Sequence, residues 1–254
     1  MLYDDVSKIP PMKVPSWDDV YSIQINEEGE DIVSLSELGD LISIQPTYWL
    51  AGIEGSFPGC YVRASVLQKL EEASRLLPDG LRLMVLDGWR SQTTQRSLFN
   101  DCYSVLRKQH PELEQSVVTQ RAKQFVALPS ENATRPSPHS TGGAVDLMIV
   151  DNNDQQLFFG APFDFPGDIS TTRYYEELLE KGEMLDAQNE QAMYNRRLLY
   201  DVMIAAGFVN YHNEWWHFEY KTQRWAYMLS KPEAYYGQKD CKQQPLDSRL
   251  SSFM

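Results

Sequence analysis

Apolar residues recur at helical spacing in several segments of the chain. In residues 63–78, RASVLQKLEEASRLLP, they fall on one face of a helix, and Pro78 follows its end. These positions are Val66, Leu67, Leu70, Ala73 and Leu77. Residues 189–206, NEQAMYNRRLLYDVMIAA, predict a second amphipathic helix, capped by Gly207. Residues 92–127 predict helix in two pieces, with Pro111 at the join.

Shorter apolar runs bounded by turn residues predict strands. GLRLMVLDGWRS (80–91) reads as a buried strand that ends at the turn signal Asp87-Gly88. The turn-rich loop PSENATRPSPHSTGG (129–143) leads to the strand AVDLMIV (144–150), and the turn DNND then leads to QQLFFGAPFDF. FVNYHN (208–213) and EWWHFEY (214–220) are aromatic and strand-like. Because helices and strands do not alternate as in βαβ units, we predict an α+β fold with a mainly antiparallel sheet flanked by helices.

The chain predicts one domain spanning residues 1–254. It contains no low-complexity linker, repeat or abrupt shift in composition. We place the core at about 60–225 and a C-terminal tail at 226–254. The N-terminal part, residues 1–59, is rich in Pro, Asp and Tyr, and we expect it to wrap the core with loops and short strands.

Composition excludes several classes of protein. Hydrophobic residues make up 42% and charged residues 23%, as in ordinary globular proteins. The formal charge of −13 disfavours binding to nucleic acid or anionic membranes. We see neither a signal peptide nor a stretch near the roughly 18 apolar residues of a membrane span. Cys60, Cys102 and Cys241 form no disulfide framework, so we expect buried, reduced thiols in a cytoplasmic protein.

Two short segments hold the residues suited to chemistry. SPHSTGGAVDLMIV (137–150) contains His139 and Asp146, and EWWH contains Glu214 and His217. Two neutral imidazoles and one carboxylate suit a catalytic zinc ion, which keeps a fourth position for water. Glu214 would then take the proton of that water. The alternative is structural: Asp146 as a turn cap, with His139 and His217 as hydrogen-bonded core residues.

These segments resemble the motifs of a known family. SPHSTGGAVD is similar to the Ser-x-His-x-x-Gly-x-Ala-x-Asp motif of zinc D-Ala-D-Ala peptidases, and EWWH to their Glu-x-x-His motif. LDGWRS resembles the Asp-Gly-Tyr-Arg segment of the VanX-type D-Ala-D-Ala dipeptidases. FGAPFDF resembles their Gly-x-x-Phe-Asp segment, and NRRLLYDVMIAAGF the helix before their second motif. The matches are co-linear and cover roughly residues 60–220.

The resemblance implies a zinc site in a cleft at the sheet. It assigns one Zn²⁺ per chain to His139, Asp146 and His217, and it makes Glu214 the catalytic base. Zinc dipeptidases of this type hydrolyse a dipeptide that has a free amino terminus. The resemblance therefore implies hydrolysis of such a dipeptide, most directly D-alanyl-D-alanine.

Three further residues correspond to substrate contacts of the family. Arg90 stands where an arginine stabilises the tetrahedral oxyanion, and Asp164 where a carboxylate holds the substrate's ammonium. Ser137 matches a serine next to the bound dipeptide. The structural alternatives are a surface salt bridge for Arg90 and a helix N-cap for Asp164.

Two other functions share the same metal motifs. One is a D,D-carboxypeptidase or endopeptidase acting on longer cell-wall peptides, and the other is a non-catalytic zinc-binding module. Asp164 favours the dipeptidase, because an enzyme that cuts inside a longer chain has no nearby ammonium to neutralise. Trp89, Ser91 and Gly143 stand where the family has tyrosine, proline and often serine. We expect a small peptide as substrate and neither nucleic acid nor membrane as partner, and we leave a homo-oligomer open.

Overall fold

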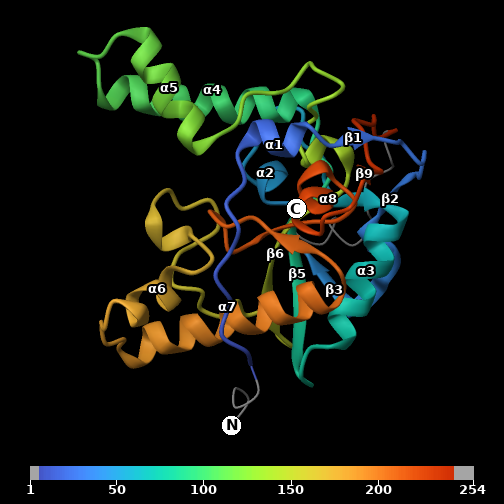
Figure 1. Ribbon diagram of the computed structural model, residues 1–254, viewed down its shortest axis with the longest axis vertical. Coiled ribbons are helices and arrows are strands. Elements are labelled where there is room, and N and C mark those ends of the chain that lie inside the picture. Colours follow the sequence, from blue (N-terminus) through green and yellow to red (C-terminus); the bar gives the residue numbers. More distant parts are fainter. Residues whose placement is uncertain (1–5, 243–254) are drawn as a thin grey trace.

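A mixed five-stranded sheet forms the centre of the computed structural model, which describes residues 6–242 (Figure 1). Its strand order is β3-β5-β6-β8-β7. The strands are β3 (Ile42–Ile44), β5 (Leu81–Asp87), β6 (Ala144–Asp151), β8 (His217–Glu219) and β7 (Val209–Asn210). All pairings in this sheet are antiparallel except β3 with β5, which is parallel. The predicted α+β fold with a mainly antiparallel sheet is confirmed, and the parallel edge is the difference.

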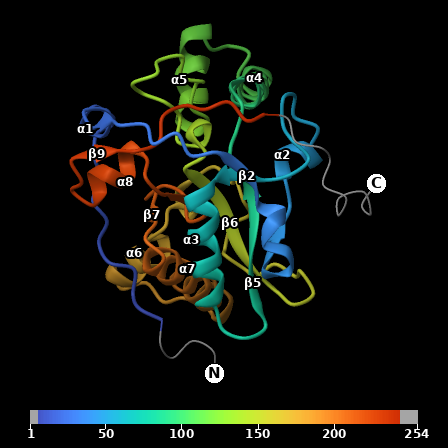
Figure 2. The same cartoon turned by 90° about the vertical axis from the view of Figure 1, so that its right-hand side faces the viewer.

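The two long central strands form because their apolar runs are buried on both faces. Successive residues point to opposite faces, and Val85 and Leu86 in β5 are 0% and 2% exposed, while Ile149 and Val150 in β6 are each 0% exposed. Helices α3 (Ala64–Arg75) and α7 (Ala187–Ala205) cover one face of the sheet (Figure 2). Both helices were predicted from their apolar periodicity, and both are confirmed.

Two further helices extend away from the sheet. α4 (Gln92–Gln109) and α5 (Gln115–Phe125) lie beside each other at the top of Figure 1. The predicted break at Pro111 is confirmed, since the chain turns between them. α4 begins at Ser91, whose hydroxyl accepts a hydrogen bond from the backbone N–H of Thr94 at 3.0 Å. The proline expected from the family is thus replaced by a helix-capping serine.

The N-terminal part adds a strand, β3, to the central sheet. They form several short elements before β4 (Tyr61–Arg63): α1 (Trp17–Tyr21), β1 (Gln24–Ile25), β2 (Ile32–Ser34), η1 (Leu35–Leu41), β3 and α2 (Thr47–Leu50). β1 pairs with β9 (Glu233–Ala234), and α1 packs on α8 (Gln223–Met228). The remaining elements are η2 (His139–Thr141), η3 (Asp168–Ser170) and α6 (Tyr174–Glu180).

One fully buried arginine, Arg63, connects the N-terminal and C-terminal parts of the described chain to the turn that bears His139. The Arg63 guanidinium donates hydrogen bonds to the backbone carbonyls of Glu30, Thr141 and Gly237, at 2.8, 2.6 and 2.9 Å. It also pairs with the carboxylate of Glu27 at 2.7 Å. Because Thr141 ends η2, these contacts fix the position of that turn.

Two expectations need correction. Only Cys60 is buried, whereas Cys102 and Cys241 are partly exposed, so the expectation of three buried thiols is wrong for two of them; all three are free. In the predicted strand EWWHFEY only His217–Glu219 is strand, because the two tryptophans lie in the preceding turn.

Among the described residues no helix is long and apolar enough to cross a membrane. The last 12 residues of the predicted tail, 243–254, lie outside the described part.

Candidate metal centre and active site

The register of the sheet brings three site residues side by side. Asp87 at the end of β5 pairs with Asp146 in β6, and Asp146 pairs with His217 at the start of β8. Residues opposite each other on neighbouring strands share a face of the sheet. Asp146 and His217 are 2% and 5% exposed, and His217 Nδ1 lies 2.9 Å from Oδ1 of Asp146.

His139 reaches the same point from the turn η2. Its Nε2 lies 3.2 Å from Nδ1 of His217 and 3.4 Å from Oδ2 of Asp146. The turn needs both glycines that follow it. Gly142 has φ +73°, and a Cβ at Gly143 would meet the carbonyl oxygen of Tyr220 at 2.7 Å. The serine that the family often has at position 143 would not fit here without movement of that strand.

His139, Asp146 and His217 are therefore brought together as a three-residue cluster. One ligand atom from each lies within 4.8 Å of the other two, and all three residues are buried. Two nitrogens and a carboxylate oxygen are a donor set that zinc accepts in catalytic sites.

The outer hydrogen bonds of the two histidines decide what the cluster can hold. Nδ1 of His139 donates to the carbonyl oxygen of Gly88 at 2.7 Å, and Nε2 of His217 donates to Oε1 of Glu219 at 3.1 Å. If both histidines are neutral, Nε2 of His139 and Nδ1 of His217 carry no proton. Their lone pairs then face each other and the carboxylate of Asp146. Such a group needs a cation, so the residues fit a zinc ion.

The electrostatics of the cluster also favour positive charge. Burial opposes protonation of His217, but hydrogen bonds and the charges of Asp146 and Glu219 raise its pKa to about 10. Burial likewise opposes ionisation of Asp146, and His139 and His217 nevertheless hold its pKa well below the ordinary value.

Glu219 contacts His217, a role that no sequence motif predicted. It is 0% exposed, and besides His217 it accepts a hydrogen bond from the hydroxyl of Thr222 at 2.5 Å. The signal was present in EWWHFEY, since residues 217 and 219 alternate onto the same face of a strand. A buried carboxylate on the outer nitrogen of a ligating histidine fixes its tautomer and orientation.

Glu214 lies at the rim of the cluster. Its Oε2 is 3.8 Å from Nδ1 of His217, and its side chain is 33% exposed. The turn that carries it is anchored by Trp215 and Trp216, which are 2% and 3% exposed. Burial of the carboxylate raises the pKa of Glu214, and the charge of His217 opposes that shift. A carboxylate with a raised pKa beside the cluster can exchange a proton with water.

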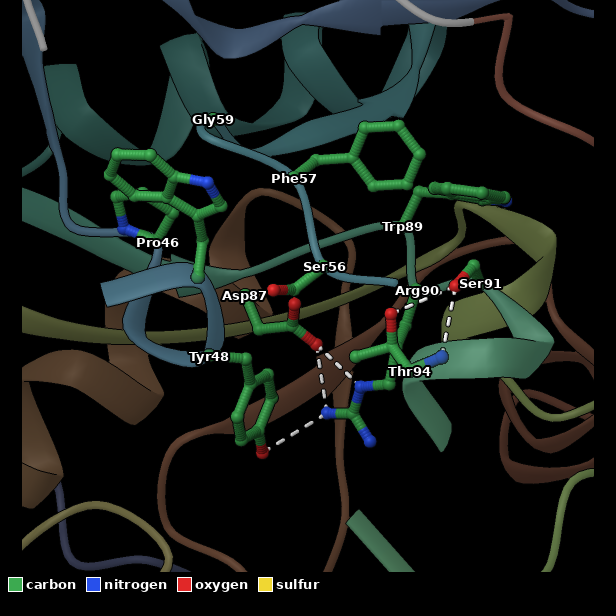
Figure 3. A pocket seen from close by; sticks show the side chains of 11 residues that line it. Pro46, Tyr48, Ser56, Phe57, Gly59, Asp87, Trp89, Arg90, Ser91 and Thr94 are labelled. Carbon is green, nitrogen blue, oxygen red and sulfur yellow. Dashed lines mark hydrogen bonds and ion pairs between the residues drawn. The ribbon is translucent and has the colours of Figure 1, made fainter. Parts of the chain in front are cut away.

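Arg90 is held by acceptors on several sides. Its Nε donates to Oδ2 of Asp87 at 2.9 Å, and Nη1 donates to Oε1 of Gln95 at 2.9 Å. Nη2 lies 3.3 Å from the hydroxyl of Tyr48 (Figure 3). It also lies 3.5 Å from Oδ2 of Asp146. The side chain is 10% exposed, so Arg90 is a fixed cation beside the cluster and the surface salt-bridge alternative is wrong.

Tyr48 connects Arg90 to Asp164. Its hydroxyl donates to Oδ2 of Asp164 at 2.7 Å, and the Arg90 guanidinium lies 4.7 Å from the centroid of its ring. Asp164 has φ +60° and caps no helix, which excludes the N-cap alternative. Although Asp164 is exposed as a residue, desolvation of its carboxylate raises its pKa, and the Tyr48 hydrogen bond opposes the shift. Tyr48 lies in the N-terminal part, where no motif pointed to it.

Ser137 is the predicted site residue that the structure leaves outside this network. It is half-buried, and its backbone carbonyl accepts hydrogen bonds from the N–H and hydroxyl of Ser140. Within the described residues its own hydroxyl contacts neither the cluster nor Arg90 or Asp164. The position nevertheless lies two residues before His139, on the loop that forms the site.

A cavity opens beside Arg90 (Figure 3). It contains about 280 Å³ of space, including its mouth, between α2 and the start of α4. Tyr48, Phe57 and Trp89 supply aromatic walls, and Asp87 lies in the lining. Trp89, where the family has tyrosine, therefore contributes to the wall of this cavity.

Comparison with known proteins agrees with this geometry. A family profile described as D-Ala-D-Ala dipeptidase matches residues 59–233, more than half of the chain. The chain belongs to this family. It is a metallopeptidase, and zinc is the metal of the family. The suspected resemblance is thereby confirmed.

The chain is also similar to individual proteins and solved structures. A D-alanyl-D-alanine dipeptidase of Synechocystis sp. is 28% identical over 235 residues, which cover 85% of this chain and 94% of that protein. One of Escherichia coli is 30% identical over 141 residues, 55% of each chain. The solved structure of the zinc complex of a vancomycin-resistance D,D-pentapeptidase, VanY, has 18% identity and a TM-score of 0.38, covering 68% of this chain and 82% of that one. The solved structure of the LdcB LD-carboxypeptidase has 18% identity and a TM-score of 0.40, and the match covers 81% of this chain and 76% of that one.

Proposed function

We propose that this metallopeptidase hydrolyses a dipeptide with a free amino terminus, most directly D-alanyl-D-alanine. His139, Asp146 and His217 would hold the zinc ion. The observation that carries the proposal is the convergence of these three donors, together with a carboxylate, Asp164, linked to them through Tyr48 and Arg90. The two sequence relatives are named for this activity.

The metal and the base divide the chemistry between them. Bound zinc supplies Lewis acidity toward the scissile carbonyl and the attacking water. Glu214 accepts the proton of that water and passes it to the leaving amine. Its raised pKa brings it nearer to the value at which a carboxylate can perform both transfers at neutral pH.

Arg90 stabilises the oxyanion that develops on the carbonyl oxygen. Because Asp87, Gln95 and Tyr48 already fix the guanidinium, it needs no rearrangement as charge develops. A preorganised donor of this kind contributes roughly 3–4 kcal/mol to the transition state. Ser137, on the loop before His139, contacts the bound dipeptide in this proposal.

Asp164 selects for a free amino terminus. Its carboxylate keeps one hydrogen bond, from Tyr48, and retains acceptor capacity for the ammonium of a short substrate. A peptide that continues beyond this point has no charge to place there. This arrangement favours the dipeptidase over a D,D-carboxypeptidase or endopeptidase.

We also propose that residues 1–254 fold as one domain. β3 joins the N-terminal part to the central sheet, and the pairing of β1 with β9 joins that part to the tail. The region 60–225 alone would lose the contact with β3, so we expect it to be less stable without the rest of the chain.

Separate variants of a ligand and of the base test the proposed function. His139→Ala should release the zinc, of which the wild type should hold about one ion per chain, because two ligands do not retain it. Glu214→Gln should keep the zinc and lower kcat by orders of magnitude, since the amide accepts no proton. Zinc content is measured by elemental analysis after gel filtration, and kcat on D-alanyl-D-alanine. Near-normal turnover of Glu214→Gln would contradict the assignment of the base.

A further inference from the structure

Arg224, in α8, is a buried guanidinium without hydrogen bonds for two of its nitrogens. Its side chain is 6% exposed, and its Nε and Nη1 have no acceptor among the described residues. Oε1 of Glu219 lies 3.3 Å from Nε, but the contact lacks the alignment of a hydrogen bond. Buried N–H groups of a cation that lack acceptors cost free energy. An acceptor from outside the chain would remove this cost.

Two aromatic rings hold the guanidinium by its faces. Its central carbon lies 4.6 Å from the centroid of the Trp17 ring and 3.8 Å from that of Tyr211. Stacking occupies the faces of the planar group and leaves the N–H donors at its edge available. Nε faces Glu219, so the edge that matches the two oxygens of a carboxylate is the one formed by Nη1 and Nη2.

Arg224 lines a small cavity. The cavity contains about 260 Å³ of space including its mouth, and Trp17, Tyr21, Pro136 and Pro138 form part of its wall. Much of this space is open to solvent, so only a small group could reach Arg224.

The charges around the cavity permit an anion. Glu219 also lines it, but its Oε1 accepts from His217 and its Oε2 from Thr222, so this carboxylate is already paired. A second cation, Arg135, lies over the ring of Tyr21 at 5.4 Å and is 51% exposed. Arg135 also lies 3.7 Å from the exposed carboxylate of Asp18, so the charges around the cavity balance and do not repel an anion.

We propose that this cavity is a binding site for a carboxylate group, held by the edge of the Arg224 guanidinium. The site is separate from the cluster of metal ligands and lies behind one of them, because Glu219 contacts both His217 and Arg224. The carboxylate has two possible sources. One is the C-terminus of the peptide substrate or product, which rests on the proposed function, and the other is a free carboxylic acid.

Titration with acetate tests the site without turnover. The zinc-loaded full chain is labelled with 5-fluorotryptophan, and the ¹⁹F resonance of Trp17 is identified by Trp17→Phe. Acetate should shift this resonance, whereas acetamide, its neutral counterpart, should not. Arg224→Gln should weaken acetate binding by about 10- to 100-fold, as expected for charge-assisted hydrogen bonds. Arg96→Gln, an exposed arginine in α4, is the matched control and should bind like the wild type.

Two results would overturn the proposal. One is a Trp17 resonance that acetate leaves unmoved in the wild type, and the other is an equal shift in Arg224→Gln. If Arg224→Gln fails to fold, Arg224→Lys carries the same test, because lysine lacks the planar fork. Unchanged acetate affinity in Arg224→Lys would likewise overturn the proposal.

Kinetics then identify the source of the carboxylate. If it belongs to the substrate, Arg224→Gln lowers kcat/KM for the dipeptide about 10- to 100-fold and leaves kcat/KM for its C-terminal amide unchanged. If the variant loses acetate binding but keeps the wild-type ratio of acid to amide, the site binds a free carboxylic acid. Both results support the site. An enzyme that cleaves no dipeptide refutes the proposed function alone, because acetate binding is measured independently.

Discussion

Glu219→Gln should weaken zinc binding although Glu219 is not itself one of the three proposed zinc ligands. The Glu219 carboxylate accepts from the outer nitrogen of His217 at 3.1 Å and is 0% exposed, so the substitution keeps the shape and removes the charge. Asp146 and Glu219 together raise the pKa of His217 from 6.5 to about 10 against the effect of burial. That shift corresponds to about 5 kcal/mol of preference for positive charge at the ring.

Part of this preference comes from the hydrogen bond and charge of Glu219, so their loss should lower the affinity for zinc. Losses of outer partners of metal ligands commonly fall between about 10- and 100-fold. The assay is competition for zinc against a fluorescent chelator at pH 7, on protein shown to be folded by circular dichroism.

Glu176→Gln is the matched control. Glu176 is also buried, at 1% exposed, and its carboxylate is paired with Arg197 at 2.6 and 2.8 Å, in α6 and α7 away from the cluster. Both variants remove the charge of a buried carboxylate that is paired with an arginine, so both should lower the free energy of unfolding by several kcal/mol. Only Glu219→Gln should lose zinc affinity. Zinc binding within twofold of the wild type in Glu219→Gln, or an equal loss in both variants, would refute the reasoning.

Two further predictions concern stability. Burial opposes ionisation of Glu30, but hydrogen bonds from Ser65 and other groups lower its pKa from 4.5 to about 2, so its stabilising effect is present above pH 4.5 and lost as pH falls toward 2. Between pH 5 and pH 2 the wild type should therefore lose about 3 kcal/mol more free energy of unfolding than Glu30→Gln, as measured by urea denaturation, and equal losses would contradict the assignment. Gly143→Ala should lower the free energy of unfolding by about 1–3 kcal/mol, because the added Cβ would meet the Tyr220 carbonyl at 2.7 Å. Gly59→Ala, with contacts no closer than 3.5 Å, should change it little. Equal urea midpoints for the two variants would refute the crowding at Gly143.

The sequence was sufficient to predict the local elements and the metal cluster. Helices α3 and α7 follow from apolar periodicity, and β5 and β6 from continuous apolar runs bounded by turns. His139, Asp146 and His217 could be grouped because their segments carry the family's motifs and because few other histidines compete. Proximity of these residues is a consequence of register, which places Asp146 opposite His217 across two strands.

The parts that were missed depend on contacts between distant segments. Tyr48 reaches Asp164 across 116 positions of sequence, from a region without a recognised motif. The parallel pairing of β3 with β5 likewise joins a short strand in the N-terminal part to the core, and three residues of strand carry too weak a pattern to predict a partner. Arg224 looks like an ordinary surface arginine in the sequence, because only the fold places Trp17 and Tyr211 on its two faces.

The central claim is that the zinc site acts on short peptides whose ammonium is held by Asp164. Its most direct test is kcat/KM of the zinc-loaded enzyme for D-alanyl-D-alanine and for its N-acetylated form, at a pH where the amine is protonated. Removing one partner of a buried charge pair costs about 2–5 kcal/mol, so the free dipeptide should be preferred by at least about 30-fold. Asp164→Ala should lose most activity on the free dipeptide and narrow this ratio. Equal or faster cleavage of the acetylated substrate by the wild type would contradict the account and favour a carboxypeptidase.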